Sequence, residues 1–289
     1  MTIAVIGTGR MGSAMAVRLR ESGLDVVVHN RSRPAAERTG APVADTAREA
    51  AGQADTVFVS LADDEAVVSS YTGPDGLVAG LRPDTVVLET STVDPETVRT
   101  MLPLVLERGA ILLAAPVSGS VPVVQRGELT FMVGGEAAAL DRVRPTLDVL
   151  AKQVFHVGEV GAGAVVKLSV NTVIHAINQA LAEALVLAER AGVPRETTYE
   201  VFAASAIASP FVGYKREAFV HPSSAPVAFT LALVAKDLDL IQALAERVDA
   251  PMRQTATTSR VVKAAVAAGL ADYDMSAIAQ FLLRGLITR

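Results

Sequence analysis

Residues 161–192 read GAGAVVKLSVNTVIHAINQALAEALVLAERAG and separate two parts of the chain that differ in character. Glycine opens and closes this stretch, and nothing between would break a helix, so the sequence predicts one helix of about 45 Å at 1.5 Å per residue. The apolar residues of this helix cover almost its whole circumference, which is typical of a buried helix. We therefore expect an interdomain helix over 161–192, preceded by a domain over 1–160 and followed by a domain over 193–289.

A narrow polar stripe interrupts the apolar surface of this helix. At 100° per residue, Lys167, Asn171 and Asn178 fall within about 40° of one another, with His175 a little to one side. A lysine on a buried helix needs a partner or a use, because desolvating an ammonium is costly and moves its pKa toward the range useful for proton transfer. The residues alone favour a plainer interpretation, in which a lysine near a helix start extends to solvent.

The composition excludes several classes of protein. The net charge is -5 with no basic run, which argues against nucleic acid or an anionic membrane as the partner. No apolar stretch of about 20 residues lacks polar or charged members, so we expect a cytoplasmic protein without a membrane span. Cysteine is absent, which excludes thiol nucleophiles and thiolate zinc sites, and the four histidines lack metal-ligand spacing. We therefore expect no metal site.

The chain begins with a dinucleotide-binding pattern. Residues 3–6 (IAVI) predict a strand, GTGRMG follows directly, and helical spacing runs over 13–21. The three glycines have the GxGxxG spacing, in which one makes the turn, one lets backbone N–H groups approach a pyrophosphate, and one lets helix and strand pack closely. This context favours dinucleotide binding over a merely tight turn. The expected cofactor contacts in this turn are Gly7, Gly9, Arg10, Met11 and Gly12.

The end of the second predicted strand, 25–29, indicates which dinucleotide is bound. An NAD-preferring site would place Asp or Glu there to accept from the ribose 2′-OH. This chain has Asn30, Arg31, Ser32 and Arg33 instead. A neutral residue followed by two arginines suits a 2′-phosphate, because guanidinium pairs with phosphate oxygens. We therefore expect NADP rather than NAD, the alternative being a solvated pair of surface arginines.

Strands and helices go on alternating up to the long helix. Further strands are predicted over 56–61, 85–90, 109–115, 129–133 and 154–157, and helices over 64–71, 95–107 and 136–150. This alternation predicts an α/β domain with a mostly parallel, doubly wound sheet of the Rossmann type. After Gly192 we find helical periodicity with proline breaks and no convincing strand, so the second domain is predicted to be all helical.

Four separated stretches resemble motifs of the β-hydroxyacid dehydrogenase family, which includes 3-hydroxyisobutyrate dehydrogenase. They are IGTGRMGSAMAVRL near the N-terminus, AAPVSGS at 114–120 followed by GELTFMVGG, GAGAVVKLSVN at 161–171, and KDLDLI at 236–241. The resemblance covers almost the whole chain in the family's order and spacing. It implies hydride transfer between NADPH and a small carboxylate or carbonyl substrate, namely a β-hydroxy acid or its semialdehyde or keto acid. The alanine, valine and leucine content of the second domain is compatible with a homodimer or homotetramer.

The resemblance implies four catalytic or substrate-binding residues. Lys167 matches the family's catalytic lysine, which acts as the acid in reduction and the base in oxidation. This role replaces the plainer interpretation of Lys167. Asn171, one helical turn further on, is expected to orient the substrate. The hydroxyl of Ser118 and the backbone N–H of Gly119 match the family's anchor for the substrate carboxylate.

Three further cofactor contacts are expected outside the first turn. Leu61 ends a predicted strand, and Thr92, with Ser91, matches the family's pair near the nicotinamide; on sequence alone Thr92 could equally be a helix N-cap. Lys236, with Asp237, matches the pair that closes on the cofactor from the helical domain. On sequence alone, Lys236 and Asp237 would be read as a charge pair on a helix surface.

The chain also departs from the family pattern. The family's aspartate is Ala114 here, its second glycine is Ser120, and bulky residues occupy 122–124, so we expect a pocket of altered shape and leave the substrate open. One alternative function is an imine reductase of similar architecture, against which Lys167 argues. Another is a non-catalytic module that senses a nucleotide, which the joint presence of Lys167, Asn171 and Ser118 makes less attractive.

Overall fold

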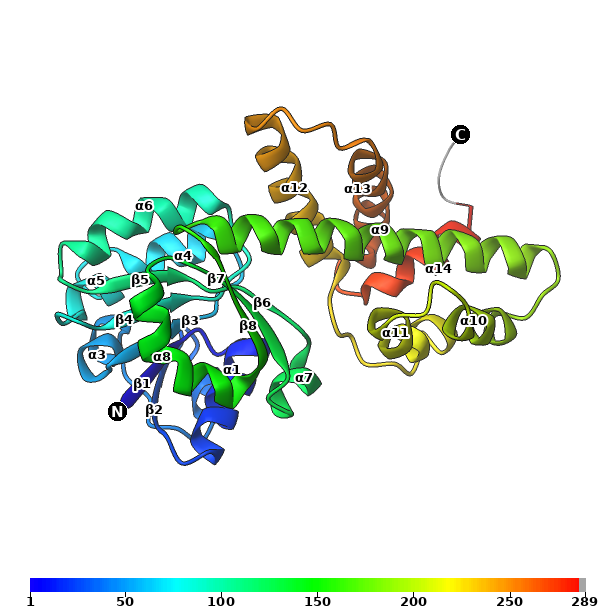
Figure 1. The fold of residues 1–289 in the computed structure, drawn as a ribbon. Helices are drawn as coiled ribbons and strands as arrows, with labels where there is room; N and C mark the ends of the chain where they lie inside the picture. Colours follow the sequence, from blue (N-terminus) through cyan, green and yellow to red (C-terminus); the bar gives the residue numbers. More distant parts are fainter. Residues whose placement is uncertain (286–289) are drawn as a thin grey trace. The chain divides into compact units, whose positions relative to one another are not determined.

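A computed structural model describes residues 1–285 of the chain, which divides into two units after Lys167, inside one long helix. The first unit is an α/β structure and the second is helical, which confirms the predicted fold class (Figure 1). The long helix, α9 (Ala162–Arg190), forms where the sequence predicted it.

The first unit is built on a mostly parallel sheet, eight-stranded within the described residues. The strands are β1 (Thr2–Ile6), β2 (Asp25–His29), β3 (Thr56–Val59), β4 (Val86–Glu89), β5 (Ile111–Ala114), β6 (Val117–Ser118), β7 (Leu129–Gly134) and β8 (Ala151–Gly158). Their order is β2-β1-β3-β4-β5-β7-β6, with β8 paired to β7. Strands β1 to β5 are parallel, whereas β7 runs antiparallel to β5 and β6. The chain reverses its direction of winding between β1 and β3, and ligands of doubly wound sheets bind outside the carboxyl ends at such a point.

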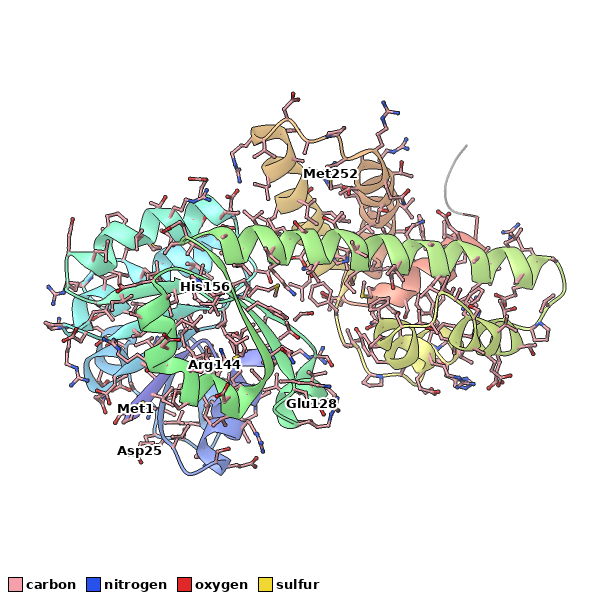
Figure 2. The ribbon with its side chains drawn as sticks, viewed as in Figure 1. Met1, Asp25, Glu128, Arg144, His156 and Met252 are labelled. Carbon is pink, nitrogen blue, oxygen red and sulfur yellow. The ribbon has the colours of Figure 1, made fainter. Side chains whose placement is uncertain are left out.

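Helices cover both faces of this sheet. One face carries α1 (Arg10–Glu21), α2 (Arg33–Glu37), α7 (Val121–Gln125) and α8 (Ala137–Leu150), and the other carries α3 (Ala47–Gln53), α4 (Asp64–Tyr71), α5 (Leu77–Gly80) and α6 (Pro95–Leu106). Successive strand residues enter opposite cores, as Val5 and Ile6 do on β1. The charged residues of α8 are exposed, among them Arg144, which Figure 2 labels. Burial of both strand faces explains the continuous apolar runs in the sequence.

Several short elements escaped the sequence analysis. They are α2, α3, α5, β6 and α7, all of seven residues or fewer. Helix α3 nevertheless has a local start signal, because the Thr46 hydroxyl accepts a hydrogen bond from the Glu49 N–H at 3.0 Å and Glu49 accepts one from the Asp45 N–H at 2.8 Å. This signal could have located the helix.

The second unit packs helices around one apolar core. Besides most of α9, it contains α10 (Arg195–Ala204), α11 (Pro210–Val220), α12 (Leu231–Arg247), α13 (Arg253–Ala265), a π-helical turn (Val266–Leu270), a 3-10 turn (Met275–Ala277) and α14 (Ile278–Leu283). In the described part of this unit, pairing of the β type is limited to one bridge between Thr230 and Asp274. Pro210, where a break was predicted, lies in the first turn of α11, a position at which proline is tolerated.

Helix α9 has the length and composition that would also allow a membrane span, and within 1–285 it alone does so. The core helix of a folded domain passes the same test. Leu168, Leu181 and Leu185 of α9 belong to the core of the second unit, whereas Val173 and Leu187 are exposed. Its apolar character is thus partly explained by packing within that unit.

Candidate functional site

The turn between β1 and α1 has two closely packed glycines and one open glycine. Gly7 has φ 91°, and a Cβ there would collide with the carbonyl oxygen of Ser60. A Cβ on Gly12 would collide with the carbonyl oxygen of Gly7, whereas a Cβ on Gly9 would meet nothing within 4 Å. The backbone is therefore closely packed at Gly7 and Gly12, whereas Gly9 faces open space.

Helix α1 begins directly at this open position. Its first turn contains Arg10 and Met11 and no acidic residue, and among the described residues no side chain caps it. A helix start with open backbone N–H groups and a positive dipole end binds the oxygens of a phosphate. The turn therefore fits the pyrophosphate of a dinucleotide.

The loop after β2 is tied to this turn by Asn30. Its Oδ1 accepts a hydrogen bond from the Thr8 N–H at 3.0 Å, and its Nδ2 donates to the Ser32 carbonyl at 3.1 Å. The two arginines of this loop differ. Arg31 is exposed, whereas Arg33 forms ion pairs with Asp45 at 2.5 Å and with Glu37 at 3.1 Å. Hydrogen bonds from Arg33 to Asp45 and Glu37 raise its pKa and hold its side chain along α2.

The loops after β3 and β4 are joined by Ser91. The Leu61 N–H donates to Ser91 Oγ at 2.8 Å, and the Ser91 N–H donates to Glu89 Oε1 at 2.9 Å. The N-cap of α6 is Asp94, which accepts from the Glu96 N–H at 2.8 Å. Thr92 therefore does not fill the alternative role of a helix cap.

Glu89 is a buried acid that the sequence analysis missed. It is the last residue of β4 and only 1% exposed. Burial raises its pKa to about 7, although hydrogen bonding by Ser91 lowers it in part. A carboxylate at the end of the apolar strand TVVLE was the available signal, because such a charge must be paired or neutralised when buried.

Ser118 and Gly119 lie at the end of β6, where that strand pairs with β7. Gly119 has φ 143°, and a Cβ there would overlap the side chains of Leu129 and Val123. The bulky residues at 122–124 belong to α7. Val124 is fully buried in the core of the first unit, and Val123 packs against that core.

Lys167 belongs to the first turns of α9, which pass close to strands β7 and β5. A Cβ on Gly163 would collide with the carbonyl oxygens of Met132, within β7, and of Ala114, at the end of β5. Lys167 follows Gly163 by four residues and therefore lies on the same side of the helix. The lysine is half-buried.

In the second unit, Asn171 and Lys236 meet at one carboxylate. Asn171 Nδ2 lies 2.7 Å from Asp237 Oδ2, and Lys236 Nζ lies 3.1 Å from Asp237 Oδ1. Asp237 is 0% exposed, so the interpretation of Lys236 and Asp237 as a surface charge pair is wrong. The rest of the polar stripe is also buried: His175 stacks on Phe229, and Asn178 Nδ2 donates to the Met275 carbonyl at 2.9 Å.

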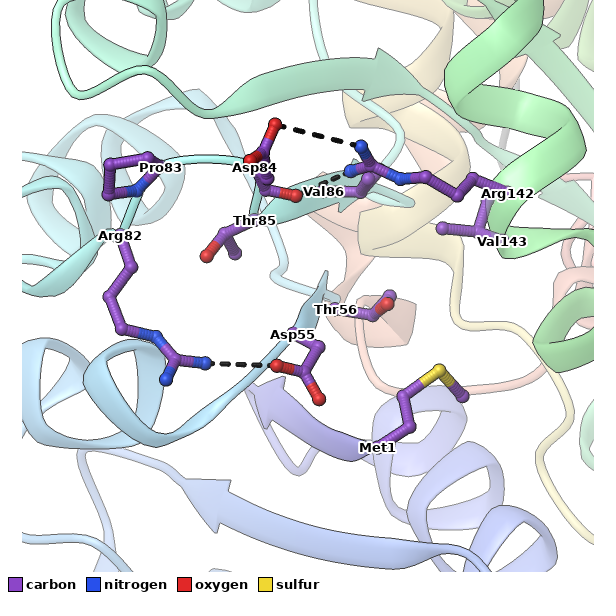
Figure 3. A pocket seen from close by; sticks show the side chains of 10 residues that line it. All are labelled: Met1, Asp55, Thr56, Arg82, Pro83, Asp84, Thr85, Val86, Arg142 and Val143. Carbon is purple, nitrogen blue, oxygen red and sulfur yellow. Dashed lines mark hydrogen bonds and ion pairs between the residues drawn. The ribbon is translucent and has the colours of Figure 1, made fainter.

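A cavity of about 700 Å³ lies at the opposite edge of the sheet, at the amino ends of β3 and β4 (Figure 3). Its charged groups are already paired with one another. The Arg82 guanidinium lies 3.1 Å from the Asp55 carboxylate. The Arg142 guanidinium contacts both the carboxylate and the backbone carbonyl oxygen of Asp84. The four charged side chains that line this cavity are thus engaged with one another, whereas the glycine turn lies at the carboxyl edge, which is the candidate site. In residues 1–285 no group of three His, Asp or Glu side chains is arranged to hold a metal.

Known proteins similar to this chain include nicotinamide-dependent dehydrogenases, as expected from the dinucleotide-binding turn. Residues 2–158 match the family model for the NAD binding domain of 6-phosphogluconate dehydrogenase, and residues 161–282 match that for the NAD-binding of NADP-dependent 3-hydroxyisobutyrate dehydrogenase. The chain is 32% identical to the chloroplastic glyoxylate/succinic semialdehyde reductase 2 of Arabidopsis thaliana, over 98% of this chain and 79% of that protein. It is also 32% identical to 2-(hydroxymethyl)glutarate dehydrogenase of Eubacterium barkeri, over 96% and 93% of the two chains. The structure of Mycobacterium tuberculosis 3-hydroxyisobutyrate dehydrogenase with L-serine is 31% identical, with a TM-score of 0.84 over 97% of this chain and 98% of that chain.

Proposed function

Because the chain belongs to the β-hydroxyacid dehydrogenase family of NAD(P)-dependent oxidoreductases, we propose that it transfers a hydride between NADPH and a small β-hydroxy acid or the corresponding semialdehyde or keto acid. The observation that carries this proposal is the turn at Gly9, which is open to a ligand and backed by a helix start without a cap. Asn30 supports it by fixing the neighbouring loop against Thr8.

The preference for NADP rests on the loop after β2. No carboxylate stands at 30–33 to accept from a ribose 2′-OH, and the Asn30 amide is already engaged with Thr8 and Ser32. Arg31 is exposed, so its guanidinium is available to a 2′-phosphate. Arg33 contributes less, because binding a phosphate would require it to leave Asp45 and Glu37.

The proposed substrate carries a carboxylate. The relatives named above include a glyoxylate/succinic semialdehyde reductase and a 2-(hydroxymethyl)glutarate dehydrogenase, and each of these names describes a carboxylate. In this chain, the Ser118 hydroxyl and the Gly119 N–H bind that carboxylate by charge-assisted hydrogen bonds. Asn171 orients the rest of the substrate by its amide.

Lys167 is the proposed acid and base. When bound, the nicotinamide cofactor supplies the hydride in reduction and takes it in oxidation. As the carbonyl is reduced, negative charge builds on its oxygen, and the Lys167 ammonium stabilises that charge and donates the proton. In oxidation the neutral amine accepts the proton from the hydroxyl. A positioned acid–base group of this kind contributes about 100- to 10,000-fold to the rate.

The test is a turnover assay with the purified protein. NADPH and NADH are offered with succinic semialdehyde, glyoxylate and a cyclic imine, and NADP with 3-hydroxyisobutyrate and L-serine. Turnover of the acids or aldehydes with NADP(H) supports the proposal, and turnover of the imine alone would replace it with imine reduction. Cofactor binding without any turnover across a broad panel would instead indicate a nucleotide-sensing module.

A further inference from the structure

Two loops at the carboxyl edge are connected by a short chain of buried hydrogen bonds. Leu61, after β3, donates its N–H to the hydroxyl oxygen of Ser91, after β4, at 2.8 Å. Ser91 in turn donates its own N–H to Glu89 at 2.9 Å. Ser91 is 5% exposed, so water does not compete freely for these groups. The conformations of the two loops are therefore coupled through one serine and one carboxylate.

The second oxygen of Glu89 lies in a different setting. Glu89 Oε2 and Tyr71 Oη are both buried, and neither has a hydrogen bond of standard geometry among the described residues. The two groups are nevertheless close enough to interact, because burial and then the charge of Glu89 raise the pKa of Tyr71. Glu89 thus uses one oxygen to hold a loop and keeps the other beside a phenol of α4.

We propose that Glu89 is a positioning residue of the cofactor site, which fixes the loops carrying Leu61 and Thr92 by accepting the hydrogen bond of the Ser91 N–H. This inference rests on the proposed function in one respect, the binding of a dinucleotide at the carboxyl edge. Glu89 acts only through Ser91 and does not touch the cofactor. Glu89 is therefore a part of the cofactor site that the sequence motifs do not include.

The protonation state of Glu89 decides how firmly it holds Ser91. An ionised carboxylate only accepts hydrogen bonds, so the Ser91 hydroxyl proton turns toward it and leaves a lone pair for the Leu61 N–H. Protonation replaces a charge-assisted acceptor with a weaker one. Burial brings the pKa of Glu89 to about 7, so both forms are populated near neutrality. The ionisable groups that act on it are Tyr71 and Asp64, both on α4.

The first measurement is the Kd of NADPH, followed by cofactor fluorescence. The pH is varied from about 6 to about 8, because this range brackets the pKa of about 7 that burial gives Glu89. Glu89→Gln keeps the size of the side chain and removes its titration. We expect it to bind NADPH about five-fold more weakly than the wild type at the alkaline end, the effect of about one hydrogen bond, and equally at the acid end. The 2′-phosphate of NADPH titrates near pH 6 in both proteins, so the ratio of the two Kd values isolates Glu89.

Glu107→Gln is the matched control, because Glu107 is exposed at the end of α6. It should follow the wild-type Kd at every pH. A ratio of Kd values for Glu89→Gln and wild type that does not change with pH would overturn the inference.

The second measurement does not depend on the cofactor. Amide hydrogen exchange of the cofactor-free protein reports how firmly Leu61 and Ser91 are held. Glu89→Gln should reduce the protection of these two amides at the alkaline end several-fold, while strand amides of β1 keep theirs. Unchanged protection would reject the positioning role even if NADPH binds. Reduced protection in a protein that binds neither NADPH nor NADH would keep the role and reject the proposed function.

Discussion

The amide of Asn171 donates a hydrogen bond to Asp237 at 2.7 Å, and both side chains are buried. The same carboxylate lies 3.1 Å from Lys236 Nζ, and His175 Nε2 is 3.6 Å from it. A buried carboxylate is stable only when it is paired and hydrogen-bonded. Asp237 therefore fixes the rotamer of Asn171, the residue proposed to orient the substrate.

Removal of this carboxylate should affect stability and turnover together. Asp237→Ala leaves the Asn171 amide without its buried acceptor, and we expect a loss of about 1–3 kcal/mol in the free energy of unfolding. Because Asn171 loses its orientation, kcat should fall as well. The effects of Asp237→Ala and Asn171→Ala on kcat should not add, since both changes disrupt one contact.

Asp239→Ala on the same helix is the control for this prediction. Asp239 forms an exposed ion pair with Lys263 at 2.6 Å, and such pairs contribute less than about 1 kcal/mol. Urea titration and steady-state kinetics of the variants provide both readouts. Strictly additive losses in kcat would show that Asp237 does not act through Asn171.

Lys167→Ala should separate cofactor binding from chemistry. The expected cofactor contacts at Gly9 and Arg31 are untouched, so the Kd of NADPH should change little. Turnover should fall by about 100- to 10,000-fold, because the acid–base group is lost. Lys167→Arg should restore little, since a guanidinium stays protonated and cannot act as a base. Near-native kcat in Lys167→Ala would refute this mechanism.

The long elements of the fold were predictable because their signals are local. Helix α4 and strand β2 have the predicted bounds, and α9 differs from its prediction by one or two residues at each end. Each has a periodic apolar pattern and a residue that breaks or caps it. Short elements such as α7 lack enough residues to show a period, and they form because the sheet beneath them offers a core.

The candidate site was predictable only in part, for a related reason. The glycine turn is a local motif, whereas the carboxylate at Asp237 meets Asn171 across 66 residues of sequence. The sequence presents Lys236 and Asp237 as neighbouring charges, and only folding decides that one of them is buried. Glu89 shows the same limit, because its raised pKa arises from its burial in the folded chain.

Cofactor choice should depend on Arg31 more than on Arg33. Arg31 is exposed, whereas Arg33 is paired with Asp45 and Glu37. NADPH should be preferred over NADH by about ten-fold in kcat/KM, which is about 1.4 kcal/mol. Arg31→Ala should raise the KM for NADPH and leave that for NADH nearly unchanged. Arg33→Ala is the matched control and should shift the preference less. An equal loss with both cofactors would mean that Arg31 supports structure.

The second unit contains a buried ion pair, and removal of one of its charges should destabilise that unit strongly. Lys215 is 1% exposed and lies 2.7 Å from Asp274 Oδ1, and Asp274 also accepts from the backbone N–H groups of Ala228 and Ser276. Asp274→Asn leaves the ammonium buried without a counter-charge, at a cost of about 3–5 kcal/mol.

Adding Lys215→Met to Asp274→Asn should recover part of this loss, because the uncompensated charge is then gone. The recovery is incomplete, because both oxygens of Asp274 accept backbone N–H bonds and an amide keeps only one of these acceptors. Urea unfolding of the single and double variants measures both values. If the double variant is as unstable as the sum of its parts, the two side chains are not energetically coupled.

Glu89 should make the protein less stable as the pH rises toward neutrality. Burial raises its folded pKa to about 7, above the ordinary value of 4.5, so the folded chain keeps a proton that the unfolded chain releases between these values. Stability falls with pH wherever the folded state binds more protons, so this group's penalty grows from about pH 4.5 and is nearly complete at pH 7. One pKa unit corresponds to about 1.4 kcal/mol, which gives a penalty of about 3 kcal/mol.

Glu89→Gln should therefore gain stability over the wild type as the pH rises from about 5 to about 8, while Glu107→Gln follows the wild type throughout. Urea unfolding at several pH values measures this difference. The global gain would accompany the local loosening of Leu61 and Ser91 inferred above, because unfolding reports the whole unit and amide exchange reports the two loops. A buried acid kept at a cost in stability is expected where its charge serves a site. Parallel pH profiles for Glu89→Gln and wild type would instead mean that Glu89 titrates as an ordinary exposed carboxylate.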